Sequence, residues 1–565
     1  MKNTQGILVP LLIIVIVSLI GIRELFLPGF FDTHDGFTHI MRLAHFNEAL
    51  RDGQFPVRWL PTWMAGYGSP VFILNYNLPY YVGSLLHSLG FSYQSSIKGV
   101  FGIGYILSGI FSLLFLKKLL KNDLAALVGS TLYLWAPYQF TDIFIRGALG
   151  ETTSFLFFPI LFYLITCAYN SKQKTFPLWT SVVWMLFILN HNIMSLIGAG
   201  LYFIYAFYLQ LRLKANLKFF INSIYVFVLG LGLAAFFWIP AILENKFTNI
   251  SNAYHFDNGY PSLKSIIYSK WQYHFAVPSN QENSMSFQLG LVHIVIPIVF
   301  IFLLVINKSK IRSKPTNHLI SLGIFLLIIF MASIYFITKA SSSIYEVFSF
   351  LKFIIFPWRF LEIATFAVAA LVSIIVVIIK KFQLMFSFVI IVLSLFLYWP
   401  YSKVITTRFS FTDVDYITMI KTNSGLFPET EFGPPRQSYY QLLKLIENRG
   451  PAWTHPFFED DSLSSSITNI RKDNLLYSAN ITSFQTAQIR ANTFYFPGWK
   501  LYIDNKETPL SKDKHGLINF YIEKGTHNIK LIFKNTPIRN IGNSISIASL
   551  IVLMILLILR LRPNF

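Results

Sequence analysis

Residues 99–116 read GVFGIGYILSGIFSLLFL, a run with no charged residue that is followed at once by Lys117 and Lys118. A helix needs about 20 mainly apolar residues to cross the hydrocarbon core of a bilayer, and this run is close to that length. Comparable tracts recur along the 565 residues, of which 54% are hydrophobic and only 13% are charged. Soluble domains carry about 25% charged residues. The sequence therefore predicts an all-α polytopic membrane protein.

Positive charge gathers in short clusters between the apolar tracts, and the formal net charge is +20. The clusters are Lys117, Lys118 and Lys121; Lys172 and Lys174; Arg212, Lys214 and Lys218; Lys308, Lys310, Arg312 and Lys314; Lys380 and Lys381; Arg560 and Arg562. Short loops rich in Lys and Arg remain on the cytoplasmic side, so these clusters indicate topology and no nucleic-acid partner is expected. They predict about 12 transmembrane helices in the cell (plasma) membrane, with both termini cytoplasmic.

The chemically dense segments then all fall on the extracytoplasmic side. They are a first external loop, 28–98, a short loop at 141–151, and the segments 241–288, 339–358 and 401–540. The apolar tract 71–89 is interrupted by polar residues and is assigned to the outer surface.

Residues 401–540 are polar, and late in this segment apolar residues alternate with others, as in Ile529, Leu531 and Phe533. Alternation with period two is typical of a half-buried strand. We therefore expect a transmembrane module over 1–400, an external α/β or β-rich domain over 401–540, and a last transmembrane helix and cytoplasmic tail over 541–565. The single cysteine, Cys167, excludes an intrachain disulfide.

The first external loop opens with FDTHDGFTHIMRLAHFNEALRDGQFPVRWLP, the stretch richest in ionisable groups. If a helix starts at about Asp35, then Asp35, His39 and Arg42 share one face. A carboxylate placed there accepts a proton from an incoming nucleophile, and a neighbouring cation holds an anionic leaving group. Asp35 is thus the predicted reacting acid, supported by His39, with Arg42 as a phosphate ligand; solvated loop residues are the alternative. Two further candidates precede Asp35 in the sequence. Asp32 is a supporting acid or base, and His34 is expected to line the cavity in which Asp35 reacts.

A second constellation, IRGALGE, contains Arg146 and Glu151. Glu151 also suits the first turn of a helix, where it complements the helix dipole. The functional interpretation is that Arg146 contacts a phosphate and that Glu151 is a second carboxylate. Asp35 and Glu151 would then share a divalent cation, Mg or Mn, since both metals prefer oxygen ligands.

Two more pairs lie at predicted ends of helices. His191 and Asn192 separate two closely spaced apolar tracts, where they either line the cavity or cap a helix hairpin. Trp358 and Arg359 begin a helix. They either anchor it at the interface, or Trp358 lines the cavity and the planar guanidinium of Arg359 binds a lipid phosphate.

These motifs resemble the GT-C superfamily of multi-pass glycosyltransferases. They are similar in particular to the bacterial YfhO-like or 6-pyruvoyl-tetrahydropterin synthase-related membrane proteins. The resemblance rests on the opening of the first external loop, on IRGALGE, and on further motifs listed here: GYGSPVFILNYNLPYYVGSLL, LNHNIMSL, WIPAILE, FPWRF and YFPGWKLYID. It implies a sugar donor linked to polyprenyl phosphate or diphosphate, a reacting acid in the first external loop at Asp35 or, less well matched, Asp32, and a second acid at Glu151. Many members use a divalent metal. The soluble segment lacks a WWD-type acceptor motif, which favours a monophosphate-linked donor.

The expected function is therefore transfer of a sugar from a polyprenyl-phosphate donor to an envelope glycan, lipid or protein acceptor on the outer face of the membrane. A transporter or flippase of lipid-linked sugars is one alternative. It predicts ionisable groups at mid-membrane and an internal repeat. A non-catalytic envelope assembly protein is the other.

Overall fold

The computed structural model describes residues 5–171, 176–213, 217–250, 260–275, 284–306, 314–422, 432–433, 439–460, 462–473 and 475–561. The basic residues Lys172, Lys174, Lys214, Lys308, Lys310, Arg312 and Arg562, and parts of the predicted external segments 241–288 and 401–540, lie outside these ranges. The chain divides into two compact units. The first comprises Met1–His39, Gln94–Leu231 and Phe256–Ser410, and the second comprises Ile40–Tyr93, Gly232–His255 and Phe411–Phe565.

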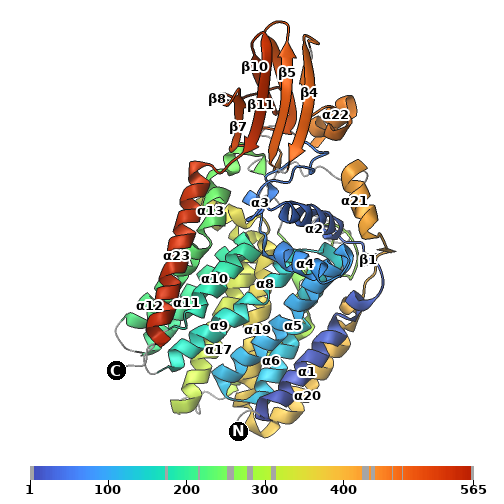
Figure 1. Ribbon diagram of the computed structural model, residues 1–565. Coiled ribbons are helices and arrows are strands. Elements are labelled where there is room, and N and C mark those ends of the chain that lie inside the picture. The colour runs from blue at the N-terminus through green and yellow to red at the C-terminus, as the bar shows by residue number, and fades with distance from the viewer. Residues whose placement is uncertain are drawn as a thin grey trace. The chain divides into compact units, whose positions relative to one another are not determined.

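The first unit is a helical bundle with one short β-ladder. Its elements are α1 Gln5–Gly21, β1 Phe30–Phe31, α5 Tyr93–Leu120, α6 Asp123–Leu134, α7 Pro137–Phe140, the π-helical turn η2 Thr141–Arg146, α8 Leu149–Ser154, α9 Phe157–Asn170, α10 Trp179–Asn190, α11 Asn192–Leu213, α12 Lys218–Leu233, α15 Leu263–Ile267, α16 Leu291–Ile306, α17 Lys314–Ile337, α18 Ser342–Val347, α19 Phe360–Ile378, α20 Gln383–Tyr398 and β2 Arg408–Phe409. Helix α19 packs on α17 and α6 (Figure 1). The segment Pro357–Ile378 is 89% buried, so α19 is the central helix of this unit.

Seven helices of the described chain are long and apolar enough to cross a membrane, and an eighth is obtained if the pair α12 and α13 (Ala235–Leu243), bent by 74°, is one span. The described chain also has four shorter apolar helices, Ile7–Gly21, Asp123–Leu134, Trp179–Asn190 and Leu291–Ile306. The largely helical membrane part is confirmed, whereas the count of about 12 crossings and their orientation stay predictions.

The predicted short loop 141–151 differs from the structure. Residues 141–151 are all buried and consist mainly of η2 and the start of α8. Gly147, at φ +64°, ends the π-helical turn in the left-handed conformation that glycine adopts without steric cost. Polar and charged side chains in this segment pair with one another, and for this reason it packs inside the unit instead of on its surface.

The second unit contains a β-rich region and several helices. These helices are most of α2 Gly36–Arg51, then α3 Val71–Leu74, α4 Leu78–Ser88, α13, α21 Asp413–Thr422, α22 Tyr439–Arg449 and α23 Pro537–Leu561. The strands are β3 Phe458–Asp460, β4 Ser465–Asp473, β5 Leu476–Ser483, β6 Ala487–Phe494, β7 Trp499–Ile503, β8 Lys506–Thr508, β9 Ser511–Lys512, β10 Leu517–Ile522 and β11 Gly525–Phe533.

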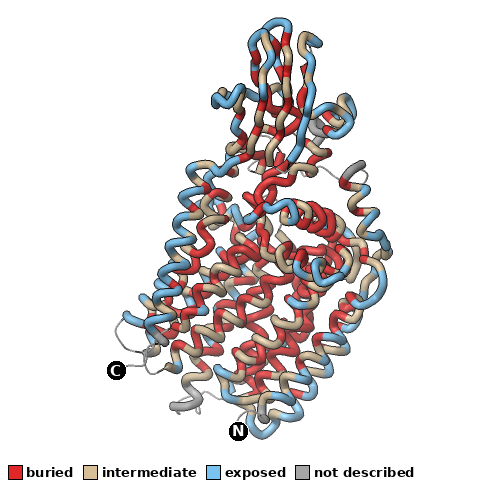
Figure 2. The backbone as a smooth tube through the Cα atoms, in the orientation of Figure 1, coloured by how far each residue is buried: buried red, intermediate tan, exposed pale blue. Residues whose placement is uncertain are grey.

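The strands form two antiparallel sheets, ordered β3-β6-β10-β9 and β4-β5-β11-β7-β8. Ile529, Leu531 and Phe533 of β11 are buried while the residues between them are not, which confirms the alternation expected from the sequence. Alternate residues along β5 are buried as well, as expected for sheets packed face to face (Figure 2).

Residues of the predicted first external loop pack with this β-rich region. The amide of Phe494 donates to the carbonyl of Tyr67 at 2.8 Å, and the Tyr67 hydroxyl donates to the carbonyl of Gly450 at 3.0 Å. Trp59 lies edge-on to Trp499. The second unit therefore combines segments from before residue 400 with segments after it. The domain limits 1–400, 401–540 and 541–565 stay predictions. Helix α23 begins at Pro537, before 541, and the Thr536 hydroxyl accepts from the Arg539 amide at 3.2 Å at this end.

Candidate functional site

The loop with the two aspartates is anchored by backbone pairing. Strand β1 pairs with β2, and directly after it the amide of Asp32 donates to the carbonyl of Thr407 at 2.9 Å. The Asp32 carboxylate accepts a hydrogen bond from the hydroxyl of Tyr273. Partial burial of that hydroxyl and the charge of Asp32 raise the pKa of Tyr273. The acid is therefore held in place by a neighbouring phenol.

Backbone hydrogen bonds hold Asp35 against the segment that contains Arg146. The amide of His34 donates to the carbonyl of Ile145 at 3.1 Å, and the amide of Asp35 donates to the carbonyl of Arg146 at 2.9 Å. A Cβ placed on Gly147 would meet the Thr33 hydroxyl at 2.3 Å, so the two segments approach as closely as glycine allows. The side chain of Asp35 is exposed, whereas its backbone is bound to the segment that carries the predicted phosphate ligand.

Four ionisable side chains form one buried cluster in the structure: Asp142, Arg146, Glu151 and Arg359. Arg146 donates to Asp142 at 2.6 Å and lies 2.8 Å from Glu151, and the Nε of Arg359 donates to the other oxygen of Glu151 at 3.0 Å. The hydroxyl of Tyr138 donates to Glu151 at 2.5 Å. Glu151 thus joins two guanidinium groups, and the sequence separation of 208 residues between Glu151 and Arg359 is closed in the fold.

Burial of this cluster strengthens the interactions between its charges and shifts the pKa values of groups in and near it. Asp142 is fully buried, and burial together with the charge of Glu151 raises the pKa of its carboxyl group. Burial and the nearby Arg146 cation lower the pKa of His34 to about 4, so His34 is neutral at pH 7. Its ring lies between Tyr273 and Phe275, with centroids 5.3 and 5.0 Å away.

Three predicted residues serve local structure. The His191 Nδ1 accepts from the amide of Met194 at 3.1 Å, which caps the first turn of α11, and the Asn192 side chain accepts from the amide of Ile193 at 3.2 Å. The capped hairpin, one of the two interpretations of this motif, accounts for these bonds. Burial lowers the pKa of His191 to about 3. His39 is buried and its Nε2 accepts from the amide of Leu149 at 3.5 Å.

Trp358 and Arg359 are both buried. The Trp358 ring stacks on Phe356 at 4.5 Å, and its indole N–H is buried without a partner among the described residues. Arg359 donates through Nη1 to the carbonyl of Ile354 at 2.5 Å, and none of its hydrogen bonds within the described chain uses Nη2. One edge of this guanidinium therefore remains for another acceptor.

Arg42 follows Asp35 on the first turns of α2, so Asp35, His39 and Arg42 have the helical spacing that the sequence predicted. Arg42 itself belongs to the second unit. There it donates to the Tyr80 hydroxyl at 3.5 Å and lies over the ring of Phe432.

The predicted sharing of a divalent cation by Asp35 and Glu151 does not fit this arrangement. The two oxygens of Glu151 already accept from Tyr138, Arg146 and Arg359, and the two arginine cations beside this carboxylate repel a metal ion. Among the described residues, no group of three His, Cys, Asp or Glu side chains is arranged to hold a metal ion. No chemistry is therefore assigned to a metal.

Several residues of the site were missed by sequence reasoning. Asn190 is buried and accepts from the Thr153 hydroxyl at 2.7 Å while donating to the carbonyl of Gly150 at 2.9 Å, so it positions the helix of Glu151. Glu362 is fully buried in α19, and both its oxygens lack a partner within the described chain. The available signal was the acid inside an apolar tract, which marks both Asp142 and Glu362 as functional candidates.

The chain is similar to two known proteins over parts of its length. An uncharacterised protein of Lactococcus lactis subsp. cremoris (strain MG1363) is 23% identical over 318 residues, which is 54% of this chain and 50% of that protein. The chain thus matches half the length of this relative. The crystal structure of an Archaeoglobus fulgidus oligosaccharyltransferase in complex with zinc and sulfate aligns with 78% of this chain and 55% of that chain, at 14% identity and a TM-score of 0.35. A likeness at that level establishes neither function nor site for this chain.

The family is established by the sequence itself. The pattern of the 6-pyruvoyl-tetrahydropterin synthase related domain, described as a membrane protein, matches residues 74–405. That range covers more than half of the chain and includes Arg146, Glu151, His191 and Arg359. The expected resemblance is thereby confirmed, and the chain belongs to the 6-pyruvoyl-tetrahydropterin synthase-related family of membrane proteins.

Proposed function

We propose that this chain is a membrane glycosyltransferase that moves a sugar from a polyprenyl-phosphate donor to an envelope glycan, lipid or protein acceptor on the outer face of the membrane. The observation that carries the proposal is the placement of Asp35. Its carboxylate is exposed on a loop whose backbone is bonded to Arg146, and Arg146 belongs to a buried cluster with Glu151 and Arg359. An exposed carboxylate is thus bound through its backbone to a buried cationic cluster.

The proposed reaction is a displacement at the anomeric carbon of the sugar. Asp35 takes the proton of the acceptor hydroxyl as the new C–O bond forms, and the lipid phosphate leaves with the electron pair of the broken bond. A positioned base of this kind contributes about 10²–10⁴-fold in rate. Asp32, held by Tyr273, is the second acid at this site.

Arg359 is the proposed phosphate ligand, because its Nη2 edge remains unused within the described chain. Arg146 supports it: its Nη1 contacts Asp142, Glu151 and Tyr138, which holds Glu151 in place, and its guanidinium adds positive charge for the phosphate. Preorganised cations stabilise charge that develops on a leaving group without a cost of reorganisation during the reaction.

The test compares wild type with Asp35→Asn in proteoliposomes supplied with a panel of radiolabelled polyprenyl-phosphate sugars. Asp52→Asn is the matched control, since Asp52 is an exposed acid at the end of the same helix region. Wild type and Asp52→Asn are expected to consume a donor, and Asp35→Asn is expected to lose at least about 100-fold of that rate. Equal turnover by Asp35→Asn removes Asp35 from the mechanism.

The buried cluster also favours a second candidate, a transporter of lipid-linked sugars, because ionisable groups inside a helical membrane bundle are typical of transport pathways. The same proteoliposomes separate the two. Movement of the intact labelled donor between leaflets without loss of its sugar supports transport, whereas release of the sugar supports transfer. A non-catalytic assembly protein does neither.

A further inference from the structure

In the second unit, two buried arginines lie near a single carboxylate. Arg539 is fully buried, and its Nε and Nη2 both lie 2.9 Å from the same oxygen of Glu244. The Thr536 hydroxyl donates to the other oxygen at 2.5 Å. Arg539 also donates to the carbonyls of Lys534 and Pro497. The charge of Glu244 is therefore already matched by Arg539.

Arg58 has no such partner. It is 8% exposed, and its donors go to neutral acceptors only: the side chain of Asn535, the side chain of Asn543 at 2.8 Å and the carbonyl of Phe236 at 3.5 Å. No carboxylate of the described chain forms an ion pair with it. Burial and the nearby Arg539 cation lower the pKa of Arg58 to about 10, so it still carries its charge at pH 7. The described group of two cations and one anion thus keeps one unmatched positive charge, and a buried charge without a counter-ion is strongly unfavourable.

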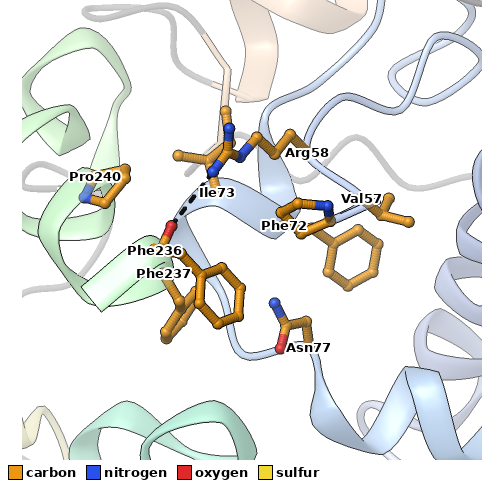
Figure 3. A pocket seen from close by; sticks show the side chains of 9 residues that line it. Val57, Arg58, Phe72, Ile73, Asn77, Phe236, Phe237 and Pro240 are labelled. Carbon is orange, nitrogen blue, oxygen red and sulfur yellow. Dashed lines mark hydrogen bonds between the residues drawn. The ribbon is translucent and has the colours of Figure 1, made fainter. Parts of the chain in front are cut away.

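This charge borders a cleft with apolar walls (Figure 3). Besides Arg58, the polar side chain lining it is Asn77, which is 1% exposed and whose carboxamide oxygen is buried without a partner in the described chain. The remaining lining residues are Pro56, Val57, Phe72, Ile73, Phe236, Phe237 and Pro240. The free space admits about one water molecule, so a single oxygen atom of a ligand can enter while the rest stays outside.

The cleft lies at one end of a candidate membrane span. Asn535 and Asn543, the two side chains that hold Arg58, flank the first turns of the span Pro537–Leu559. On the same helix Ile541 is 56% exposed and Ile545 is 40% exposed, which is expected for side chains that face hydrocarbon. The end of a membrane span is the depth of lipid headgroups, where phosphate groups are the abundant anions.

We propose that this cleft binds the phosphate group of a lipid. One phosphate oxygen enters it as the missing counter-ion of Arg58, within the cleft that the Asn77 carboxamide also lines, and the hydrocarbon chain lies along the exposed apolar side chains of α23. Free phosphate supplies the same oxygen but gains nothing from these apolar surfaces. The residues of this cleft belong to the second unit and Asp35 belongs to the first, and the assignment does not rest on the proposed transfer reaction.

The experiment uses the full chain in micelles of an uncharged detergent and follows its thermal unfolding midpoint. It is titrated in parallel with decyl phosphate and with inorganic phosphate. A saturable rise of the midpoint with decyl phosphate, and none at equal concentrations of inorganic phosphate, is the expected result, because a ligand that binds the folded state stabilises it. No saturable shift, or an equal shift with inorganic phosphate, overturns the assignment to a lipid.

Two variants and one control locate the effect. Asn543→Asp places a carboxylate directly on Arg58 and supplies the counter-ion internally, so the protein is expected to stay folded and to bind decyl phosphate at least about tenfold more weakly. Arg58→Gln removes the charge and is expected to weaken binding similarly. Lys524→Gln removes one positive charge from an exposed turn and is expected to leave the affinity within about twofold of wild type. Undiminished binding by Asn543→Asp contradicts the proposal even if Arg58→Gln fails to fold.

Discussion

The buried pair between Glu151 and Arg359 allows a quantitative prediction through a double-mutant cycle. Glu151→Gln leaves Arg359 buried with the carbonyl of Ile354 and without any carboxylate in contact within the described chain, whereas Arg146 keeps Asp142. Arg359→Gln leaves Glu151 with Arg146 at 2.8 Å. The two substitutions are therefore unequal, and Glu151→Gln is expected to be the more damaging.

Removing one partner of a buried ion pair costs about 3–5 kcal/mol, mainly because the other charge stays buried. We expect Glu151→Gln to fall in this range and Arg359→Gln below it, because Glu151 retains a second arginine. Once Glu151 is neutral, removing Arg359 deletes a charge that has lost its partner. The double variant should therefore cost less than the sum of the single variants, with a coupling energy on the order of 1–3 kcal/mol.

The assay is the free energy of unfolding in mixed micelles titrated with a denaturing detergent, measured for wild type, both single variants and the double variant. Glu507→Gln serves as control, since Glu507 pairs with Lys500 at 2.6 Å but both side chains are about half exposed, and no change is expected there. If the two single costs add within about 0.5 kcal/mol, the pair is not energetically coupled and the description of Glu151 as the centre of the cluster is refuted.

Three other perturbations test the surroundings of the site. Gly147→Ala is expected to lower the transfer rate by displacing the acid-bearing loop, because its Cβ would clash at 2.3 Å, whereas Gly53→Ala, also at positive φ but in open space, should leave the rate unchanged. The pKa of His34 is about 4 in the folded protein and about 6.5 when unfolded, so between these pH values the unfolded chain binds a proton that the folded protein does not. The free energy of unfolding therefore falls as the pH drops from about 6.5 to 4, and His34→Phe should flatten this part of the stability–pH curve. Asn190→Ala removes bonds to α8, the helix of Glu151, and should cost about 1–3 kcal/mol of stability, while Asn192→Ala, whose side chain bonds only a neighbouring amide among the described contacts, should cost less.

Most of the helices were predictable from the sequence, because exposing polar groups to lipid is costly and membrane-spanning segments are therefore locally rich in apolar residues. The apolar run 99–116 lies within α5, Tyr93–Leu120, and the alternation around Leu531 marks a strand. The same local rule failed at 141–151. There Asp142 and Arg146 satisfy each other at four residues' spacing, which allows a charged segment to be buried. The spacing of Asp142 and Arg146 suits a helical ion pair, but spacing cannot show that Arg359, 208 residues from Glu151, completes the cluster.

The candidate site was predictable in its parts and not in its connections. Asp35, Glu151 and Arg359 were each visible as ionisable residues at the ends of apolar tracts, but the contact of Glu151 with Arg359 requires the folded bundle. That contact also bears on the metal interpretation, since it places a second arginine cation against the carboxylate that a metal ion would share. Glu362 lies inside an apolar tract, which is itself a signal of function, but the sequence does not show which groups surround it. Its burial beside charged groups appears only in three dimensions.

The most direct test of the central claim separates donor binding from chemistry in Asp35→Asn. Single-turnover transfer and donor affinity are measured on the same proteoliposomes, with the donor that wild type consumes. If Asp35 is the base, the variant binds the donor within about twofold of wild type and its transfer step slows by about 10²–10⁴-fold. An unchanged transfer step, or a loss explained entirely by weaker donor binding, contradicts the assignment of Asp35 as the reacting carboxylate.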